Sequence, residues 1–498
     1  MKSQEFTITT YNMLAKSLGT NTIPWVMHVS PSLRQRILQA QQHASGDSFS
    51  TWVDQVLKPP YLQHFHKNFA SGSYAAMRSF WGAPVCVSQA DIPPELHGLT
   101  FVEPDVVAYH VAATDDDDDD DKATTKRIQA TTLRGILKQN LPNDLFQEFF
   151  DEVISKQQSV YEWNVRGPRI FDTITKQKAG IISIQEYDCH DAKADYRGNG
   201  MSESFSQAMA SVGYSGVFLK DPLLGRDPPS GLGVFWHNTS FETATCKKVG
   251  METIECNAQG FNESVYNIDL QERWHPISKV VSTRESELMA SADRRNAAIC
   301  RLRHKATGRI VTLVTAHLMT VSRDGVKTNL FPGEVRAGEL ATMKQVLVEL
   351  SSSSSSSSRV VAADDDDAVL LVGDFNTNAA EAIEIFSGRI QASDSETNVR
   401  EFETGFNVKN KTFQWGSHTL KDAFTNIHQW GLAVGEEGYC TSRNANRIEW
   451  IDYIYYDCNK LDDPLHLSKC HTPGQMIPDK ENPSDHLPLT ATFRFSTK

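Results

Sequence analysis

The apolar residues of this chain fall into short runs that end in a polar residue. This is the pattern of β-strands that deliver polar side chains to one edge of a sheet. Val, Ile, Thr and aromatic residues dominate the runs, as is typical of strands. The pattern predicts strands at Phe6–Asn12, Gly180–Glu186, Gly231–His237, Ile310–His317, Ala368–Asp374, Ile448–Tyr456 and Leu487–Phe495.

Between the strands, apolar residues recur at three- and four-residue spacing, which predicts helices. From Pro168 to Gly180, a proline near the first turn, Ile170 and Ile174 four residues apart, and a glycine stop favour a helix. The segment Gly333–Leu350 shows the same periodicity. Strands that alternate with helices from residue 165 to the end predict an α/β domain.

Residues 27–159 do not follow this rhythm, which predicts a long insertion into a domain formed by 1–26 and 160–498. Aromatic-rich, helix-like stretches within it indicate that the insertion is partly helical. The consecutive aspartates at 115–121 predict a disordered, solvated loop inside it. Residues 351–367, rich in Ser and Asp, predict a second flexible loop between a helix and a strand.

Composition and charge exclude several classes of protein. Hydrophobic residues make up 40% of the 498 residues and charged residues 22%, an ordinary globular balance. No apolar run approaches the ~18 residues of a membrane span. The 49 Lys and Arg stand against 62 Asp and Glu, but the Asp runs at 115–121 and 364–367 hold eleven of these, and 49 against 51 remain. Any nucleic-acid surface must therefore be a local basic patch.

Cysteine usage and the first residues favour an intracellular protein. The eight cysteines form no CxxC pair and are spread along the chain, as expected of reduced thiols. The printed sequence enters a strand-like segment at Phe6 without an apolar signal core or an Arg-rich transit helix. We therefore expect a cytoplasmic or nuclear protein without a membrane partner.

Candidate catalytic and ligating residues stand at or near the predicted strand ends: Asn12, Glu186, His317, Asp374, Asn376, Asp452, Asp485 and His486. Such groups of α/β proteins collect outside strand ends. Asn and carboxylate oxygens suit Mg²⁺ or Mn²⁺, and histidines beside the ion suit phosphate binding and proton transfer. Each residue taken alone also has a structural interpretation, for example Asp374 as a turn cap or Asp452 as a buried hydrogen-bonding group.

Six motifs occur in one order along the chain: TYNMLA, SIQEYD, TAHL, GDFN, IDYIYY and PSDHLPL. Together they resemble the endonuclease/exonuclease/phosphatase superfamily, most of all its branch of carbon-catabolite-repressor-type deadenylases, nocturnin and the Angel proteins. Four shorter matches resemble the same branch: Trp163–Arg166, Gly213–Phe218, Arg295–Ala298 and Cys440–Ser442. The resemblance covers 1–26 and about 160–498. It implies a four-layer sandwich of two sheets with helices on both outer faces.

The resemblance also implies a magnesium-dependent site, with Mn²⁺ as an alternative cofactor. Glu186 would be the main ligand, with Asn12 beside it in the metal and phosphate network. Asp485 would support the metal or the leaving group.

The remaining implied roles concern catalysis and substrate binding. Asp374 would orient and deprotonate the attacking water, while Asn376 and His317 would donate hydrogen bonds to the phosphoryl oxygens. Asp452 would pair with His486 and fix its ring. Asn296 and Lys220 would contact the substrate. Phosphoryl transfer needs this combination of a nucleophile, a metal and donors, and an Asp–His pair fixes a tautomer in other hydrolases.

The substrate is the least determined part of this interpretation. A local basic patch would come from Lys220, Arg226, Arg294, Arg295 and Lys421, which could equally be solvated surface charges. Phe375 and Trp415 are candidates for base stacking at the rim, with packing beneath the site as the alternative for Phe375. The loop Asp188–His190 is expected to face solvent. The branch typically has a proline near GDFN and a Gln at the position of Glu339, and these departures leave the substrate open.

The preferred prediction is a hydrolase that removes nucleotides from RNA 3′ ends as a poly(A)-specific 3′-5′ exonuclease, a deadenylase of mRNA decay that releases 5′-AMP. A second prediction is a phosphatase on a nucleotide or another small phosphorylated metabolite, which needs no extended basic track. A third is a non-catalytic binding protein on the same fold. The sequence indicates no particular protein partner.

Overall fold

The computed structural model describes two large parts of the chain and several short pieces. The described residues are 4–14, scattered positions from 30 to 40, 100–103, 106–110, 125–128, 142–160 and 162–220 with small gaps, 231–244, 254–256, 265–270, 296–318, 332–352, 367–377, 382, 412–424, 440–444, 447–468 and 477–497.

The first sheet is built around β1 (Glu5–Asn12), the strand nearest the N-terminus. β1 runs parallel to β5 (Ile181–Gln185) and antiparallel to β22 (Leu489–Arg494). The order across the sheet is β11 (Ile254–Cys256), β8 (Tyr214–Lys220), β9 (Gly231–His237), β5, β1, β22 and β21 (His466–Leu467). The carboxyl ends of β1 and β5 therefore lie side by side at one edge.

The second sheet is built around β14 (Ile310–His317) and β15 (Ala368–Asp374), which are parallel. β20 (Asp452–Asp457) runs antiparallel on the other side of β15. The order is β10 (Phe241–Thr243), β13 (Asn296–His304), β14, β15, β20, β17 (His418–Asp422) and β16 (Thr412–Trp415), and β12 (Val265–Asp269) also pairs with β13. Every residue of β15 is buried, which suits an apolar strand with neighbours on both sides and layers on both faces.

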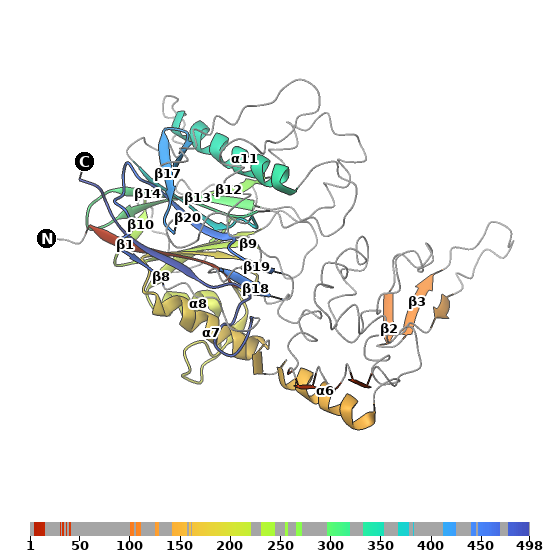
Figure 1. The fold of residues 1–498 in the computed structure, drawn as a ribbon. Helices are drawn as coiled ribbons and strands as arrows, with labels where there is room; N and C mark the ends of the chain where they lie inside the picture. The colour runs from red at the N-terminus through yellow and green to blue at the C-terminus, as the bar shows by residue number, and fades with distance from the viewer. Residues whose placement is uncertain are drawn as a thin grey trace, which may run out of the picture.

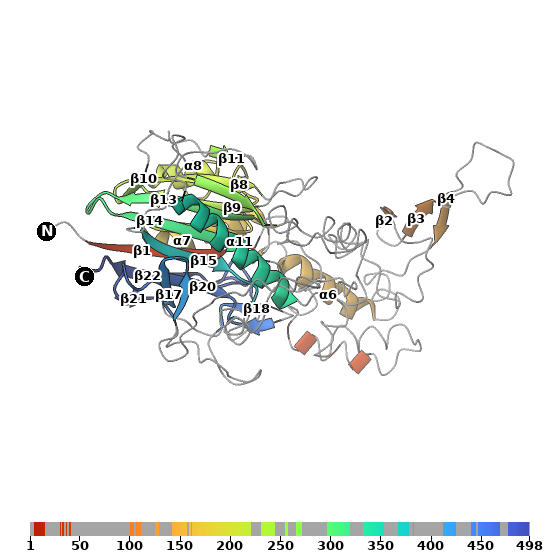
Figure 2. The same cartoon turned by 90° about the horizontal axis from the view of Figure 1, so that it is seen from above.

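Helices cover the outer faces of both sheets (Figures 1 and 2). α7 (Trp163–Lys176) and α8 (Phe205–Ser211) lie against the first sheet, and α11 (Pro332–Ser352) lies against the second. α8 begins with a capping box, in which Ser204 and Gln207 satisfy each other's backbone N–H groups. The four layers confirm the predicted α/β sandwich.

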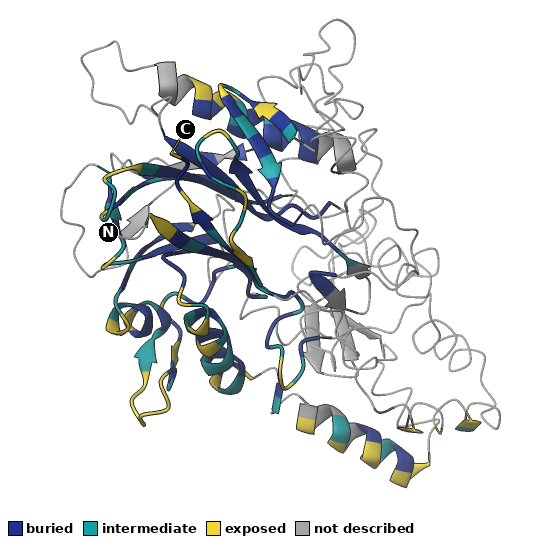
Figure 3. Cartoon of the chain, turned by 60° about the vertical axis from the view of Figure 1, so that its left-hand side comes forward, coloured by how far each residue is buried: buried dark blue, intermediate teal, exposed yellow. Residues whose placement is uncertain are grey.

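Strand alternation divides the apolar residues between two cores. Ile181 packs between the two sheets, in the larger core that also includes the buried residues of α11. Ile182 and Ile184 point the other way, to Ile170 and Ile174 of α7 in the second core. Figure 3 shows the result, with exposed residues on the outer sides of the helices and buried ones along the strands.

Two predicted elements have different bounds in the structure. α7 begins at Trp163, so Pro168 lies inside the helix and not in its first turn. The proline removes one backbone hydrogen bond, but burial of Trp163 and Arg166 anchors the turn ahead of it. The strand predicted at Ile448–Tyr456 is divided into β19 (Arg447–Glu449) and β20, because the backbone N–H of Ile451 turns to the Thr441 hydroxyl.

The two predicted loops and the insertion lie largely outside the described residues. Within 27–159 the structure describes α6 (Asn143–Lys156) and a sheet that was not predicted, of β2 (Thr100–Glu103), β3 (Val106–His110) and β4 (Thr125–Ile128). The Asp run 115–121 and residues 353–366 are not described. At the ends of the predicted loop 351–367, α11 continues to Ser352 and Asp367 is buried in an ion pair with Arg301.

The helices in the described part of the chain include none that is long and apolar enough to cross a lipid bilayer.

Candidate active site

Three predicted site residues form one row across the second sheet. His317 and Asp374 are register partners at the ends of the parallel strands β14 and β15, and Asp374 is the partner of Asp452 at the start of β20. Partners across neighbouring strands project from the same face of a sheet. The row therefore presents an imidazole and two carboxylates side by side.

The carboxylate of Asp374 lies at the centre of the site. Its Oδ2 accepts a hydrogen bond from Asn12 Nδ2 at 2.9 Å and lies 3.5 Å from His317 Nε2 and 3.6 Å from His486 Nε2. Its Oδ1 accepts the backbone N–H of Asn376 at 2.9 Å. All five residues are buried. A single carboxylate oxygen thus faces three nitrogen groups from different parts of the chain.

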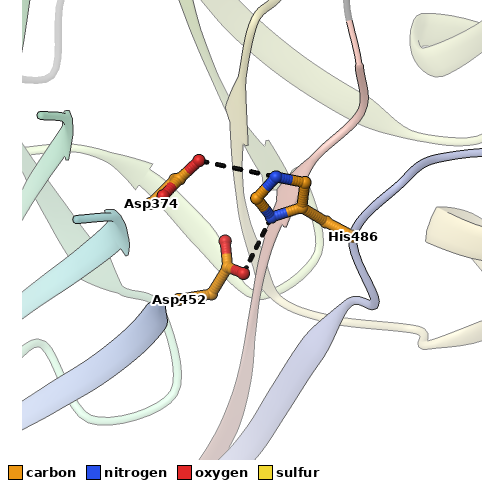
Figure 4. Close-up of side chains that lie close together, drawn as sticks. All are labelled: Asp374, Asp452 and His486. Atoms are coloured by element: carbon orange, nitrogen blue, oxygen red, sulfur yellow. Dashed lines mark hydrogen bonds and ion pairs between the residues drawn. The ribbon is translucent and has the colours of Figure 1, made fainter. Parts of the chain in front are cut away.

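The ring of His486 faces both Asp374 and Asp452, one with each nitrogen, as Figure 4 shows. Its Nδ1 lies 2.9 Å from Asp452 Oδ2, which leaves Nε2 directed to Asp374. Burial by itself lowers the pKa of His486, but three neighbouring carboxylates outweigh burial and raise the pKa to about 9. These carboxylates belong to Asp452, Asp374 and Asp485. The ring therefore carries a proton on both nitrogens at neutral pH in the metal-free chain.

Glu186 reaches the same place from the first sheet. Asn12 Nδ2 donates to Glu186 Oε1 at 3.2 Å and also to Asp374, and so connects the two sheets. His317 Nε2 lies 3.9 Å from Glu186 Oε1. Glu186 has a φ of 56° and Asn376 a φ of 48°. Non-glycine residues in this region cost on the order of 1–3 kcal/mol each and are concentrated at functional sites.

The donor groups of the site suit a hard cation. Asp374 and Asp452 place carboxylate oxygens within 4.8 Å of each other, and His486 lies in the same group but, when protonated on both nitrogens, offers no lone pair to an ion. Glu186 adds a third carboxylate, and oxygen donors are what Mg²⁺ and Mn²⁺ prefer. The same surplus of negative charge raises the pKa of His486, so a cation would be attracted electrostatically. The residues therefore fit a divalent metal ion.

Asn12 has a more specific position than the sequence predicted. Its Oδ1 accepts the backbone N–H of Leu14 at 3.0 Å, while its Nδ2 faces the two carboxylates. In this orientation Asn12 holds Glu186 and Asp374 together as a donor. Its predicted place as a metal ligand would require the amide to turn over.

Two predicted substrate residues lie at strand ends next to this centre, and the pairing of Ala297 with Ala316 places Asn296 beside His317. Asn296, at the start of β13, donates its side-chain N–H to the carbonyl of Leu219 at 2.8 Å and lies near that of Lys220 at 3.4 Å. It therefore ties the second sheet to the end of β8. Lys220 is exposed at that strand end. Asp485 lies at the centre, with Oδ1 3.9 Å from His486 Nε2.

Several expectations about the rim of the site are wrong. Phe375 and Trp415 are 0% and 1% exposed and cannot stack on a base. Trp415 packs on Phe413, and Phe375 packs on Tyr455, which agrees with the alternative prediction that it is a packing residue. Lys421 pairs with Asp463 beside the far end of β20. Arg226, Arg294 and Arg295 lie outside the described residues.

The prediction that the loop after Glu186 faces solvent is also wrong, because Asp188 and Cys189 are buried. Burial lowers the pKa of the Arg166 guanidinium. The nearby negative charge of Asp188 acts in the opposite direction and offsets part of this effect. Arg166 in turn donates to the carbonyls of Met13 and Leu14, directly after Asn12. In the sequence, the only indication that Arg166 has a role at the site was its position in the Trp163–Arg166 motif.

Ser484 and Thr441 support the site and were not predicted to do so. Ser484 Oγ donates to the carbonyl of Asn12 at 2.6 Å and accepts the N–H of His486 at 3.2 Å. Thr441 Oγ1 accepts the backbone N–H of Asp452 at 3.1 Å. Both residues lie inside recognised motifs, PSDHLPL and Cys440–Ser442, so their position in the sequence was the available signal.

No protein-family model and no curated protein matches the chain. Among solved structures, the catalytic domain of human Nocturnin with bound sulfate is 18% identical, with 66% of this chain and 86% of that one covered and a TM-score of 0.37. ANGEL2, named as a 2′,3′-cyclic phosphatase in complex with adenosine-2′,3′-vanadate, is 16% identical, with coverages of 69% and 92% and a TM-score of 0.42. An endonuclease/exonuclease/phosphatase from Bacteroides vulgatus is 16% identical, with coverages of 68% and 94% and a TM-score of 0.37.

These names agree with the resemblance that the six motifs carry. The chain is similar, in its six motifs and among solved structures, to proteins of the nocturnin and Angel branch of the endonuclease/exonuclease/phosphatase superfamily.

Proposed function

We propose that this chain is a metal-dependent hydrolase of phosphate esters, and specifically a phosphodiesterase. One observation carries the proposal: Asp374 Oδ2 lies within 3.6 Å of two imidazole nitrogens, and one of these rings is held by Asp452. A carboxylate that can accept a proton, next to two cationic or donor groups, is the arrangement that hydrolysis of a phosphate ester needs.

Each group has a definite task in this reaction. Asp374 accepts the proton of the attacking water. His317 and His486 direct their Nε2 atoms to the same small space, where they donate to the oxygens of a phosphoryl group as its charge grows. Asp452 holds the His486 ring so that Nε2 stays in place. A bound Mg²⁺, held by Glu186 with Asp374 or Asp485, would supply Lewis-acid stabilisation of the same charge.

For the substrate we propose the 3′ end of RNA, with poly(A) as the preferred tail and 5′-AMP as the product. The motif resemblance supports this choice, and exposed Lys220 at the end of β8 can contribute positive charge for the phosphate backbone. Such an enzyme would act in the cytoplasm or nucleus.

A phosphatase on a small phosphorylated molecule is the second candidate. It is favoured by the charge balance outside the two Asp runs, 49 basic against 51 acidic residues, which offers no extended basic surface. A non-catalytic binding protein is disfavoured, because Glu186, Asp374 and His486 are all present and in contact through shared partners.

The test is an incubation of the purified chain in Mg²⁺ and in Mn²⁺ with a 5′-labelled RNA that ends in an oligo(A) tail. A panel of other substrates is run beside it, with a 2′,3′-cyclic phosphate end, nucleotides and sugar phosphates. Glu186→Gln is the inactive variant. Glu5→Gln is its matched control, because Glu5 forms an exposed ion pair with Arg494 at the opposite end of the same sheet.

Stepwise shortening that stops at the tail boundary and disappears in Glu186→Gln would support the deadenylase. Hydrolysis of panel substrates alone would select the phosphatase. A folded, metal-loaded chain that hydrolyses nothing in the panel would overturn the proposed function.

A further inference from the structure

Four polar side chains are buried between the two sheets, in a region that is otherwise apolar. Gln185 Nε2 lies 2.9 Å from Ser183 Oγ, 3.2 Å from Thr10 Oγ1 and 3.4 Å from Thr315 Oγ1. Ser183 Oγ lies 2.6 Å from Thr315 Oγ1. All four side chains are 0% exposed. We call Thr10, Ser183, Gln185 and Thr315 the inter-sheet polar cluster.

The cluster lies directly behind the site along three strands. Thr10 precedes Asn12 by two residues on β1, and Thr315 precedes His317 by two residues on β14. Gln185 is the residue before Glu186. Two residues along a strand span about 6.6 Å and project to the same face. The cluster therefore joins the same strands as the site, one step further into the sandwich.

The cluster also crosses between the sheets. Thr10, Ser183 and Gln185 belong to the first sheet, and Thr315 belongs to the second. The site is divided in the same way, since Asn12 and Glu186 come from the first sheet and the row of His317, Asp374 and Asp452 from the second. The metal and phosphate groups can meet only if the two sheets keep one relative position.

We propose that the inter-sheet polar cluster sets this relative position, and that Ser183 and Thr315 are positioning residues for the metal site. The inference rests on the metal site of the proposed function. Apolar packing between sheets is non-directional and tolerates small shifts, whereas hydrogen bonds between buried groups require one geometry. An arrangement in which the cluster is broken leaves buried hydroxyl or amide groups unsatisfied.

A second buried pair in the same sheet offers a matched control. Thr9 Oγ1 lies 2.9 Å from Thr490 Oγ1, between neighbouring strands of the first sheet. Thr9 is the chain neighbour of Thr10, so its side chain projects to the opposite, helix-covered face. Loss of this hydroxyl contact affects stability without changing the contact between the sheets.

The test compares Thr315→Val, Thr315→Ser and Thr490→Val in the full chain. Mn²⁺ affinity is measured by titration and stability by the thermal midpoint Tm, so neither readout needs a substrate. Val keeps the shape of Thr and removes the hydroxyl, and Ser keeps the hydroxyl. Ser183→Ala is a milder second variant in case Thr315→Val does not fold.

We expect Thr315→Val and Ser183→Ala to weaken Mn²⁺ binding by about tenfold, the lower end of what loss of an outer partner does to a metal site. Thr490→Val should lower Tm to a similar extent with Mn²⁺ affinity within about twofold, and Thr315→Ser should bind nearly as the wild type. Equal Mn²⁺ affinities for Thr315→Val and Thr490→Val would overturn the inference. A wild-type chain that binds Mn²⁺ but hydrolyses nothing overturns the proposed function alone, and one that binds no Mn²⁺ overturns the inference as well.

Discussion

One strand, β20, carries a buried Asp–His pair at each of its ends. At its start, Asp452 Oδ2 lies 2.9 Å from His486 Nδ1. At its end, Asp457 Oδ2 lies 2.8 Å from His418 Nδ1. All four residues are at most 3% exposed. By distance and burial alone the two pairs are nearly the same.

Their surroundings differ. The other nitrogen of His486 faces Asp374 at 3.6 Å and Asp485 at 3.9 Å, with Asn12 and His317 on the same carboxylate. His418 has no ion pair with a second carboxylate among the described residues, and the other oxygen of Asp457 accepts the N–H of Asn459 in the following turn. An Asp–His pair thus orients a ring, and what the free nitrogen faces decides whether the ring can do chemistry.

The largest difference is expected between Asp374, the carboxylate that faces His486 Nε2, and Asp457, the carboxylate that pairs with His418. Asp374→Asn removes the proton acceptor and should lower the rate of phosphodiester hydrolysis by about 10³–10⁴-fold, near the upper range for general-base catalysis. Asp457→Asn should leave the rate per folded molecule within about threefold. Single-turnover rates at saturating Mn²⁺ measure both. An equal loss in Asp457→Asn would remove the distinction between the two pairs.

Substitution of His486 should also lower the hydrolysis rate more than substitution of His418, by a smaller factor than for the two aspartates. His486→Asn keeps a polar side chain but loses the cationic donor at Nε2, so we expect the rate to fall by about 10²–10³-fold. His418→Asn should change the rate by less than about threefold while lowering Tm. A wild-type rate in His486→Asn, under conditions in which Glu186→Gln is inactive, would contradict a catalytic role for His486.

Each end also has a glycine with a positive φ. Gly373 has a φ of 140°, and a Cβ there would lie 2.0 Å from the carbonyl oxygen of Ala316. Gly373→Ala should therefore lower the free energy of unfolding by about 3 kcal/mol or more and displace Asp374. Gly416, with a φ of 64° and Val348 Cγ2 at 3.2 Å, should lose only about 1 kcal/mol on substitution by Ala. Urea unfolding with both variants measures the difference.

The last comparison concerns a pH dependence of stability that comes from His486. Its pKa in the folded chain, about 9, lies above the ordinary value of 6.5, so the folded state holds a proton that the unfolded state releases. The stabilisation is complete below pH 6.5 and is lost as the pH rises through 9. It amounts to on the order of 3 kcal/mol.

The measurement is urea unfolding in EDTA between pH 6 and 10. His486→Asn should remove this part of the pH dependence, and His418→Asn should keep it. A wild-type chain whose stability does not fall across this range would contradict the assignment.

Local sequence was sufficient for strands whose buried runs are continuous. β9, β14 and β15 have the predicted bounds, because long apolar runs with a polar end can form few other elements. β16 and β17 were not predicted, since short strands that alternate half-buried and buried residues depend on a distant partner, here β20. The predicted exposure of Asp188, Cys189 and Trp415 was wrong for the same reason, because burial is decided by segments far along the chain.

What the sequence by itself determined is the identity of the polar residue at each strand end, because this follows from local pattern and from motifs such as GDFN and PSDHLPL. Only the tertiary structure decided which of them meet. Asn12 and Asp374 are 362 residues apart in sequence and share a 2.9 Å hydrogen bond because two sheets pack face to face in one register. The same packing surrounds Asp452 and His486 with charges and leaves Asp457 and His418 as a structural pair, a difference that no local pattern contains.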